Sequence, residues 1–294
     1  MRIAYYPGCE AKIVAKEANQ ATKTVLEKLG IEWVELENAG CCGSMELRID
    51  HLDAMLYLNG RILALAEEVK ATKLLTICNT CALNLNTAAS IYNKDEIEQE
   101  RLNQVLSIYG RRYTGTTEVI TLPWLLLRLI GFHGMRRAVK KPLDKLKIAT
   151  FYGCHMIRPT KFYGFEHSMK PSSMDIIIKE LLDGYTINYH GKSSCCGFHT
   201  LLTEEKTSTA MVSYLVKNAV QGEADCIVTP CTQCHTVLDT YQERALKASG
   251  ENDMEIPIIH LSQLVGLAFG IPKVELGFDR HVVNALKLLE DRGF

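Results

Sequence analysis

The chain has 294 residues, enough for one large domain or two of about 150 residues each. Its 47% hydrophobic and 23% charged residues exclude a disordered or fibrous protein, and its net charge of −1 gives no overall field that would attract nucleic acid or an anionic membrane. The 11 cysteines stand out, because a chain of this size forms a core without disulfides.

The first half predicts alternating strands and helices. Residues 2–7 begin as a strand and lack the apolar run and cleavage site of a secretory signal, so we expect a cytoplasmic protein whose cysteines are reduced or bind metal. Apolar residues at helical spacing, including Val14 and Val25, predict a helix over 13–29 that stops at Gly30. We further expect a strand over 31–36, a helix over 52–70 and a buried strand over 74–77.

The longest apolar run is residues 122–131 (LPWLLLRLIG), which contains Arg128 and is shorter than the roughly 20 residues that span a bilayer. We expect a buried helix and no membrane span, with a helix at a lipid surface, placed by Trp124 and Arg128, as the alternative. The basic segment 133–147 that follows is expected to be a solvated linker. Docking of an acidic partner protein is the other reading of that segment.

The second half predicts a helix over 174–182, a strand over 185–189, a helix over 204–220 and a strand over 226–229. Strands that alternate with helices form parallel sheets with right-handed crossovers. The fold class predicted is therefore α/β, with two repeated Rossmann-like domains that each have a mainly parallel sheet flanked by helices.

The two halves repeat three cysteine motifs in the same order. The pairs are RIAYYPGC and KIATFYGC at 2–9 and 147–154, Cys-Cys-Gly at 41–43 and 195–197, and Cys-x-x-Cys at 78–81 and 231–234. The segments 120–131 and 259–270 also match. We therefore predict two domains, residues 1–140 and 141–294, each a copy of the other.

Every motif follows the carboxyl end of a predicted strand, the edge at which parallel sheets gather binding residues. Each copy thus brings five cysteines together, one more than a structural zinc site or a cubane iron–sulfur cluster needs. Cys41 and Cys42 are expected to point apart and so to reach different metal atoms. We favour one polynuclear iron–sulfur centre per domain over zinc, with a redox dithiol third.

Two cysteine patterns have simpler readings. The segment 231–235 matches the attachment pattern of c-type haem, but the first copy has Ala82 where the second has His235. Haem is therefore disfavoured. Cys226 has no counterpart in the repeat and is expected to be a buried core residue.

At these motifs the sequence resembles the CCG-domain (cysteine-rich) family, and within it the family of B subunits of the heterodisulfide reductases of methanogenic archaea. The likeness covers essentially the whole chain. The segments that carry it are LENAGCCG at 36–43, CNTCALNL at 78–85, SCCGFHTL at 194–201 and TPCTQCH at 229–235.

The resemblance implies a catalytic subunit that, in methanogenesis, reduces the mixed disulfide of coenzyme M and coenzyme B to two thiols. It implies two non-cubane [4Fe-4S] clusters with five ligands each, namely Cys9, Cys41, Cys42, Cys78 and Cys81, and Cys154, Cys195, Cys196, Cys231 and Cys234. The implied partners are the ferredoxin-like and the flavin-bearing subunits of heterodisulfide reductase, together with a hydrogenase or formate dehydrogenase. The chain has no ferredoxin-type cysteine run of its own, so electrons are expected from another polypeptide.

The second copy has 40 residues between its first two cysteine motifs where the first copy has 31. The excess falls around 158–171, where Arg158, Lys161 and His167 are candidates for binding the anionic groups of the substrate. A surface loop without function is the alternative.

Disulfide reduction also needs two protons. His155, His199 and His235 lie next to or near cysteine ligands and are the candidate donors, although each could be a structural histidine. The alternative function is an iron–sulfur electron-transfer subunit of another CCG-family oxidoreductase, of the glycolate/lactate or succinate/fumarate type, that passes electrons to a quinone or a partner's flavin. A zinc-bound scaffold is the third possibility.

Overall fold

The computed structural model describes residues 2–162, 165–251 and 254–294. This part of the chain contains two four-stranded, all-parallel sheets with strand orders β2-β1-β3-β4 and β6-β5-β7-β8. The strands are β1 (Arg2–Tyr5), β2 (Glu32–Glu35), β3 (Lys73–Thr76), β4 (Glu118–Thr121), β5 (Lys147–Thr150), β6 (Tyr185–Thr186), β7 (Cys226–Thr229) and β8 (Ile258–His260). The two sheets have the same order, so the predicted α/β repeat is confirmed.

Helices cover both faces of the first sheet. Alternate residues of β1 point to opposite faces: Ile3 packs in one apolar cluster with α2, and Ala4 packs in another with α4 and α5. The elements of this half are α1 (Gly8–Ile13), α2 (Lys16–Lys28), α3 (Glu46–Asp50), α4 (Leu52–Glu68), α5 (Asn79–Tyr92), α6 (Glu96–Ser107), α7 (Leu122–Trp124), the π-helical η1 (Leu125–Ile130) and α8 (Gly131–Ala138).

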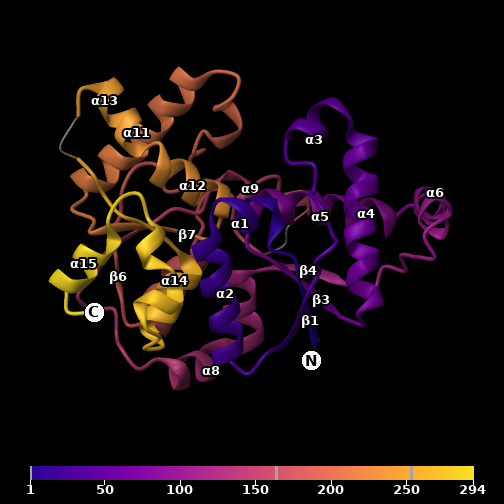
Figure 1. Cartoon of the computed structure of the whole chain (residues 1–294), viewed down its shortest axis with the longest axis horizontal. Coiled ribbons are helices and arrows are strands. Elements are labelled where there is room, and N and C mark those ends of the chain that lie inside the picture. The colour runs from indigo at the N-terminus through magenta and orange to yellow at the C-terminus, as the bar shows by residue number, and fades with distance from the viewer. Residues whose placement is uncertain (1, 163–164, 252–253) are drawn as a thin grey trace.

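The second half is joined to the first by a shared core. Each apolar cluster holds residues of both sheets, for example Ile3 with Ile148 and Ala4 with Ala149, and helix α2 packs against α14 (Figure 1). The elements are α9 (Cys154–Ile157), η2 (Thr160–Phe162), α10 (Ser173–Ile176), η3 (Ile177–Leu181), η4 (Phe198–Thr200), α11 (Glu205–Gln221), α12 (Thr232–Thr240), α13 (Gln242–Ser249), α14 (Leu261–Ala268), η5 (Lys273–Leu276), η6 (Phe278–Arg280) and α15 (Ala285–Asp291).

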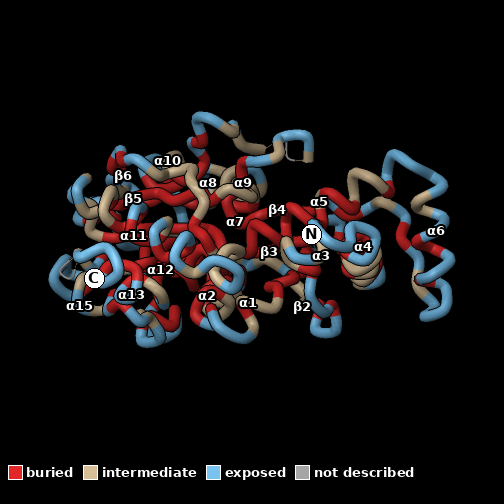
Figure 2. The backbone as a smooth tube through the Cα atoms, turned by 90° about the horizontal axis from the view of Figure 1, so that it is seen from above, coloured by how far each residue is buried: buried red, intermediate tan, exposed pale blue. Residues whose placement is uncertain are grey.

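Buried chain runs through the strands and the middle of the molecule, whereas α6 lies at one end and is largely exposed (Figure 2). The predicted boundary between residues 140 and 141 lies between the two sheets but stays a prediction, because the apolar clusters cross it.

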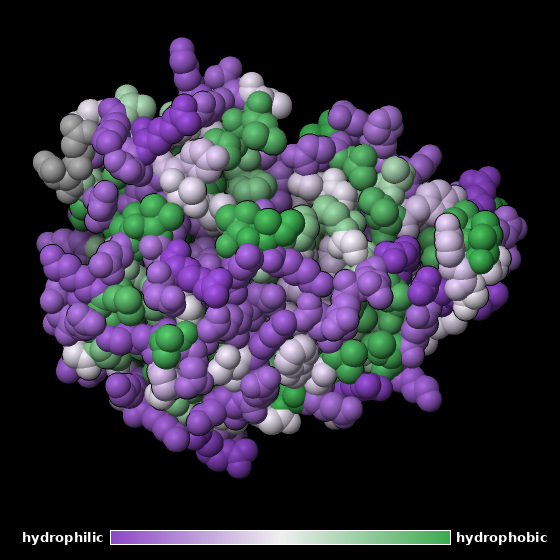
Figure 3. All heavy atoms as spheres, viewed as in Figure 1, coloured by the Kyte–Doolittle hydropathy of each residue, from purple (hydrophilic) through white to green (hydrophobic). Residues whose placement is uncertain are grey.

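The helix predicted over 13–29 is in fact two helices. Gly8, with φ of +82°, starts α1 directly after the first strand, and a break at Val14 and Ala15 redirects the chain into α2. Val14 was expected in the buried stripe, yet it is 50% exposed, and Ile13 is 69% exposed. Hydrophobic side chains gather over this part of the surface in Figure 3. The periodicity missed the break because the residues at the end of α1, Ile13 and Val14, are apolar although they lie at the surface.

Two further expectations need correction. A strand was predicted over 185–189, but strand β6 has only two residues. The Ile187 N–H still donates to the Ile148 carbonyl, at 2.9 Å, and the chain then leaves the sheet. Residues 133–138 of the expected linker belong to α8. The apolar run 122–131 is helical and partly buried as expected, and among the described residues no helix is both long and apolar enough to cross a membrane.

Candidate functional site

The ten repeated cysteines lie beyond the carboxyl ends of β1, β2 and β3 in the first half and of β5, β6 and β7 in the second. These strands are neighbours in each sheet, so their cysteines converge as predicted. Cys78 and Cys231 occupy the N-caps of α5 and α12, so two helix N-termini, which favour thiolate over thiol, point at the site. We call the five cysteines of each half the first and the second cysteine set.

The ten thiols form one continuous series of contacts. Sγ of Cys9 lies 3.5 Å from Sγ of Cys41, and hydrogen bonds between neighbouring thiols continue from there across both sets. The order is Cys9, Cys41, Cys42, Cys81, Cys78, Cys231, Cys234, Cys196, Cys195 and Cys154. The series is symmetric about the contact between Cys78 and Cys231, where the two sets meet.

Cys41 and Cys42 do not point apart, contrary to expectation. The thiol of Cys41 contacts those of both Cys9 and Cys42, although Cys41 is exposed and Cys42 is only 2% exposed. The segment is not extended, because Gly40 and Gly43 on either side have φ of +76° and +87°. The two adjacent cysteines therefore belong to the same cradle.

The crowding of thiols changes their acidity. Hydrogen bonds from Cys42 and Cys9 lower the pKa of Cys41 to about 2, and those from Cys154 and Cys196 lower the pKa of Cys195 to about 2. The thiols that donate these hydrogen bonds have their pKa shifted in the opposite direction. The pKa of Cys9, for example, is raised first by its hydrogen bond to Cys41 and then by burial. In the second set burial raises the pKa of Cys231, but hydrogen bonds from Cys234 and Cys78 outweigh it, so that this pKa is also lowered. Each set thus combines acidic thiols with neighbours that can lose their protons to a thiophilic metal.

Two glycines leave room beside the thiols. A Cβ on Gly8 would lie 3.0 Å from Sγ of Cys81, and one on Gly153 would lie 3.1 Å from Sγ of Cys234; both glycines have positive φ. A side chain at either position would therefore intrude on the cradle and strain the backbone. Five sulfurs in a cradle kept open by glycine fit iron–sulfur binding.

The junction between the sets is tightly built. The backbone N–H of Asn79 lies 3.4 Å from Sγ of Cys231, and its side chain donates to the Tyr152 carbonyl at 3.0 Å. The N–H of Thr232 donates to the Ile77 carbonyl at 3.2 Å. The first turns of α5 and α12 are therefore fixed against one another across the two halves.

A small cavity lies beside this junction, and two predicted histidines line it together with Thr80, Gln233 and Phe198. The hydroxyl of Thr80 donates to Oε1 of Gln233 at 2.5 Å, and its oxygen lies 2.9 Å from Nδ1 of His155 and 3.2 Å from Nε2 of His199. Because a hydroxyl has one hydrogen, both rings must donate to Thr80. Burial, and then the charge of His199, lowers the pKa of His155 to about 4, so its ring is neutral at neutral pH.

Thr80 and Gln233 were missed from the sequence. Both occupy the second variable position of a Cys-x-x-Cys motif, which the ligand pattern leaves unspecified. The sequence did contain a signal for them, because Thr80 and Gln233 occupy equivalent positions of the two repeats. Equivalent residues beside a symmetric junction face each other.

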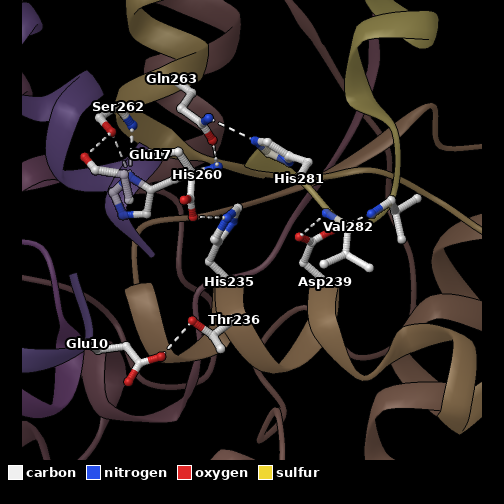
Figure 4. A network of polar contacts seen from close by, with 12 residues as sticks. Glu10, Glu17, His235, Thr236, Asp239, His260, Ser262, Gln263, His281 and Val282 are labelled. Carbon is white, nitrogen blue, oxygen red and sulfur yellow. Dashed lines mark hydrogen bonds and ion pairs between the residues drawn. The ribbon is translucent and has the colours of Figure 1, made fainter. Parts of the chain in front are cut away.

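His235 is not brought into this cavity. Its side chain is 2% exposed and points the other way, where Nε2 lies 2.9 Å from a carboxylate oxygen of Glu17 (Figure 4). The next residue, Thr236, donates to Glu10 at 2.7 Å. A role for His235 as proton donor stays a prediction without geometric support.

The three candidate anion-binding residues lie on the exposed segment after α9. Arg158 donates to the carbonyl of Ser193, two residues before Cys195, and Lys161 lies over the ring of Phe162 at 4.7 Å. His167 accepts the backbone N–H of Met169 at 3.1 Å. Of these three residues, only Arg158 is thus held next to a cysteine loop. Tyr163 and Gly164 of this segment lie outside the described residues. Cys226, as expected, is a fully buried core residue of β7.

Comparison with known proteins agrees with the repeat. The sequence model of the cysteine-rich domain CCG matches residues 3–86 and 148–239. A solved structure of a hypothetical protein from Helicobacter pylori matches with a TM-score of 0.81 and 17% identity over 97% of this chain and 52% of that one. That likeness supports the fold alone.

Two relatives align with nearly the whole chain. The 8-methylmenaquinol:fumarate reductase membrane anchor subunit of Wolinella succinogenes is 39% identical over 285 residues, which are 97% of this chain and 98% of the relative. The B subunit of the ferredoxin:CoB-CoM heterodisulfide reductase of Methanosarcina mazei is 30% identical over 289 residues, 97% of this chain and 91% of the relative. Both relatives are named as subunits of redox enzymes.

Proposed function

Since this chain belongs to the cysteine-rich CCG family, we propose that it is an iron–sulfur subunit of a multisubunit oxidoreductase, with one non-cubane [4Fe-4S] cluster on each cysteine set. The observation that carries the proposal is the continuous series of ten thiols, five on each side of the contact between Cys78 and Cys231. Four-ligand zinc or cubane sites would leave one thiol of each set unused.

When bound, two such clusters supply two single-electron centres, which together match a two-electron reaction. The residues of this chain would hold the two clusters, shield them from water and supply protons beside them. Gly8 and Gly153 keep the cradles open, the joined turns of α5 and α12 hold the sets together, and burial of Cys42 and Cys196 excludes water from their inner sides.

The reaction that we favour is electron transfer in a quinol-linked dicarboxylate oxidoreductase of the succinate/fumarate type. It is supported by the 39% identity to the fumarate reductase relative, against 30% for the heterodisulfide reductase relative, at equal coverage of this chain. In this role the chain passes electrons between a quinol and a flavin-bearing partner protein and performs no disulfide chemistry.

A relative named as a membrane anchor raises the question of attachment, given that no described helix is suited to cross a membrane. Helix α8 offers an alternative, because exposed Phe132 lies on the same helix as exposed Arg136 and Arg137. Apolar and basic side chains on one short helix suit the surface of an anionic bilayer. Flotation with anionic lipid vesicles should recover the protein, and Arg137→Glu should weaken that recovery.

The second candidate is reduction of the coenzyme M–coenzyme B disulfide, with the ferredoxin-like and flavin-bearing subunits of heterodisulfide reductase as partners. The observation that favours it is the cavity at the junction of the sets, where Thr80 contacts both His155 and His199. A group that receives two electrons there also needs two protons, and the two rings, joined through the Thr80 hydroxyl, lie where they could relay them. Arg158, Lys161 and His167 are the candidates for holding the anionic substrate, with Arg158 the best placed.

One experiment separates the candidates. The protein is purified anaerobically, its iron is counted, and its electron paramagnetic resonance spectrum is recorded while coenzyme M, the heterodisulfide or a menaquinol analogue is added in parallel. The quinol-linked role predicts reduction by the menaquinol analogue and no response to coenzyme M. A spectrum that changes with coenzyme M supports the disulfide role instead, and a chain with zinc in place of iron would overturn both.

A further inference from the structure

A cavity of about 170 Å³ lies at the edge of the first sheet, beside strand β4, and has no part in the site described above. Its walls include Trp124 of α7, Arg128 of η1, Phe162 of η2 and Phe165 of the segment that follows. The volume is comparable to that of cavities of about 150 Å³ that take up a single aromatic ring. Because the exposed side chain of Arg128 forms part of the wall, a larger ligand can extend from the cavity to the surface.

The wall that comes from the first half departs from the internal repeat. Residues 120–131 match 259–270, yet Trp124 and Arg128 have Gln263 and Leu267 as their counterparts. The backbone differs as well, because η1 is π-helical whereas α14 is an ordinary α-helix. Single π-helical turns occur frequently at functional sites. The aromatic and cationic groups of this wall therefore belong to the first half alone.

The wall that comes from the second half departs from the repeat too. Phe162 and Phe165 belong to the segment 158–171, which accounts for the longer spacing of the cysteine motifs in the second copy. Two features that the halves do not share thus meet at one cavity. A packing defect of the common domain fold would recur in both halves, so this cavity indicates a role of its own.

The polar groups of the cavity suit the oxygens of a flat aromatic ligand. The guanidinium of Arg128 lies 5.4 Å from the ring centroid of Phe165, and no described residue forms an ion pair with it or accepts its hydrogen bonds. The side-chain amide of Asn86, which also lines the cavity, donates to the Ala82 carbonyl at 2.9 Å, so its oxygen remains an acceptor. A donor and an acceptor thus lie among rings that can pack against the face or edge of another ring.

Short stretches of chain connect the cavity to the second cysteine set and to helix α8. Buried Met156 lines the cavity and is two residues after Cys154, so the single short helix α9 carries both a wall of the cavity and a cysteine ligand. Helix η1, which carries Arg128, leads directly into α8 with its exposed Phe132. A ligand that arrives from a bilayer beside α8 would therefore meet this cavity close to the second set.

We propose that the cavity binds the aromatic head group of a quinol, an inference that rests on the quinol-linked function proposed above. Arg128 donates to a ring oxygen, Asn86 accepts from a hydroxyl, and the aromatic side chains pack against the ring. Oxidation of the quinol to the quinone breaks two O–H bonds and releases two electrons and two protons. The electrons pass singly to the clusters of the two cysteine sets. The protons leave through Glu118, whose half-exposed carboxylate lines the cavity and pairs with Lys73.

Tryptophan fluorescence of the anaerobically purified, iron-loaded chain tests binding. The probe is a dimethylnaphthoquinone in which both free carbons of the quinone ring are methylated, so that it cannot alkylate the thiols. Trp33, the second of the two tryptophans, lies on β2 at the opposite edge of the sheet, and Trp33→Phe leaves Trp124 as the reporter. We expect saturable quenching by one quinone per chain.

Substitutions then assign the quenching to the cavity. Arg128→Gln and Phe165→Leu should each weaken the affinity, the first by about tenfold, because they remove the donor and an aromatic wall. The matched control is Arg101→Gln on the distant helix α6, which should leave the affinity unchanged. Absence of saturable quenching, or wild-type affinity in both cavity variants, would overturn the proposal.

Reduction of the iron separates the cavity from the function on which it rests. The quinol form of the probe is mixed with the chain at a limiting concentration, and the electron paramagnetic resonance signal is followed. Reduction should be about tenfold slower in Arg128→Gln than in the wild type, with iron content unchanged. Equal rates would mean that the quinol reacts elsewhere, which overturns the cavity and leaves the proposed function intact. Saturable quenching without reduction would support the cavity as a binding site and contradict the quinol-linked function.

Discussion

The two cysteine sets have the same ligands on the same strand order, but they differ in their surroundings. In the first set Cys41 is exposed, whereas no cysteine of the second set is more than partly exposed. Cys154 is followed by His155, which reaches the cavity, while Cys9 is followed by Glu10, which instead bonds Thr236 at 2.7 Å. His199 likewise has Met45 as its counterpart in the repeat.

This difference indicates a division of labour. The second set lies beside groups that can move protons, and the first lies closer to solvent and to any partner that docks there. The two cysteine sets are equivalent in the repeat, but the second has histidines beside it and the first has an exposed thiol.

The largest expected effect comes from removing one ligand from each set. Cys81→Ser and Cys234→Ser should each lose about half of the iron, because serine is a poor ligand and each cluster depends on its own five thiolates. Iron analysis and visible spectra measure the loss, and Cys226→Ala, a core cysteine outside both sets, should keep all the iron. If either ligand variant loses all of the iron, the sets are a single unit and the comparison fails.

Next in size is the effect of the cavity histidines on turnover. His155→Gln or His199→Gln should slow two-electron turnover by about 100-fold if the ring delivers a proton, with iron content unchanged. The first-half counterparts provide the control, since Glu10→Gln and Met45→Leu should change turnover by less than about threefold. Equal effects in both halves would remove the proposed division of labour.

Acid should destabilise the folded protein through a buried histidine of the second half. Burial lowers the pKa of His260 from 6.5 to about 3, so the folded state resists a proton that the unfolded chain accepts. The contribution of His260 to the free energy of unfolding is complete above about pH 6.5 and is lost as the pH falls toward about 3. Between about pH 7 and about pH 4.5 the loss is roughly 2–3 kcal/mol.

His260 aligns with Thr121 of the first half, which does not titrate. Urea unfolding of the wild type and of His260→Asn at both pH values measures the difference. The variant should lose less stability in acid than the wild type, and an equal loss would assign the acid sensitivity to other groups.

The smallest effect is expected at the glycines beside the thiols. Gly8→Ala and Gly153→Ala should each cost about 1–2 kcal/mol of backbone strain and also weaken iron retention in the adjacent set. Gly30→Ala is the matched control, because Gly30 has φ of +66° but nothing within 4 Å of an added Cβ. It should show the strain without the loss of iron. Iron loss in all three variants would mean that strain alone is responsible.

The sequence predicted the features that follow from repetition and strand order. The duplicated motifs and their place after strands predicted both sheets and the convergence of ten cysteines, because parallel topology leaves few alternatives. It did not predict the turn at Cys41 and Cys42, since two left-handed glycines override the alternation of an extended segment. The sequence also did not predict that His235 lies apart from His155 and His199. Consecutive residues of a helix such as α12 point in different directions, so a position next to a cysteine ligand does not place a side chain in the site.

The contact between Cys78 and Cys231 joins equivalent positions of the two halves. In a homodimer of single-domain chains, the same position would be occupied by one cysteine and its own copy. The junction therefore has the residue pairing of an isologous dimer interface inside one polypeptide. Covalent linkage of the two copies freed each half to diverge, which a homodimer cannot do, and the unequal surroundings of the two sets are what that freedom allows.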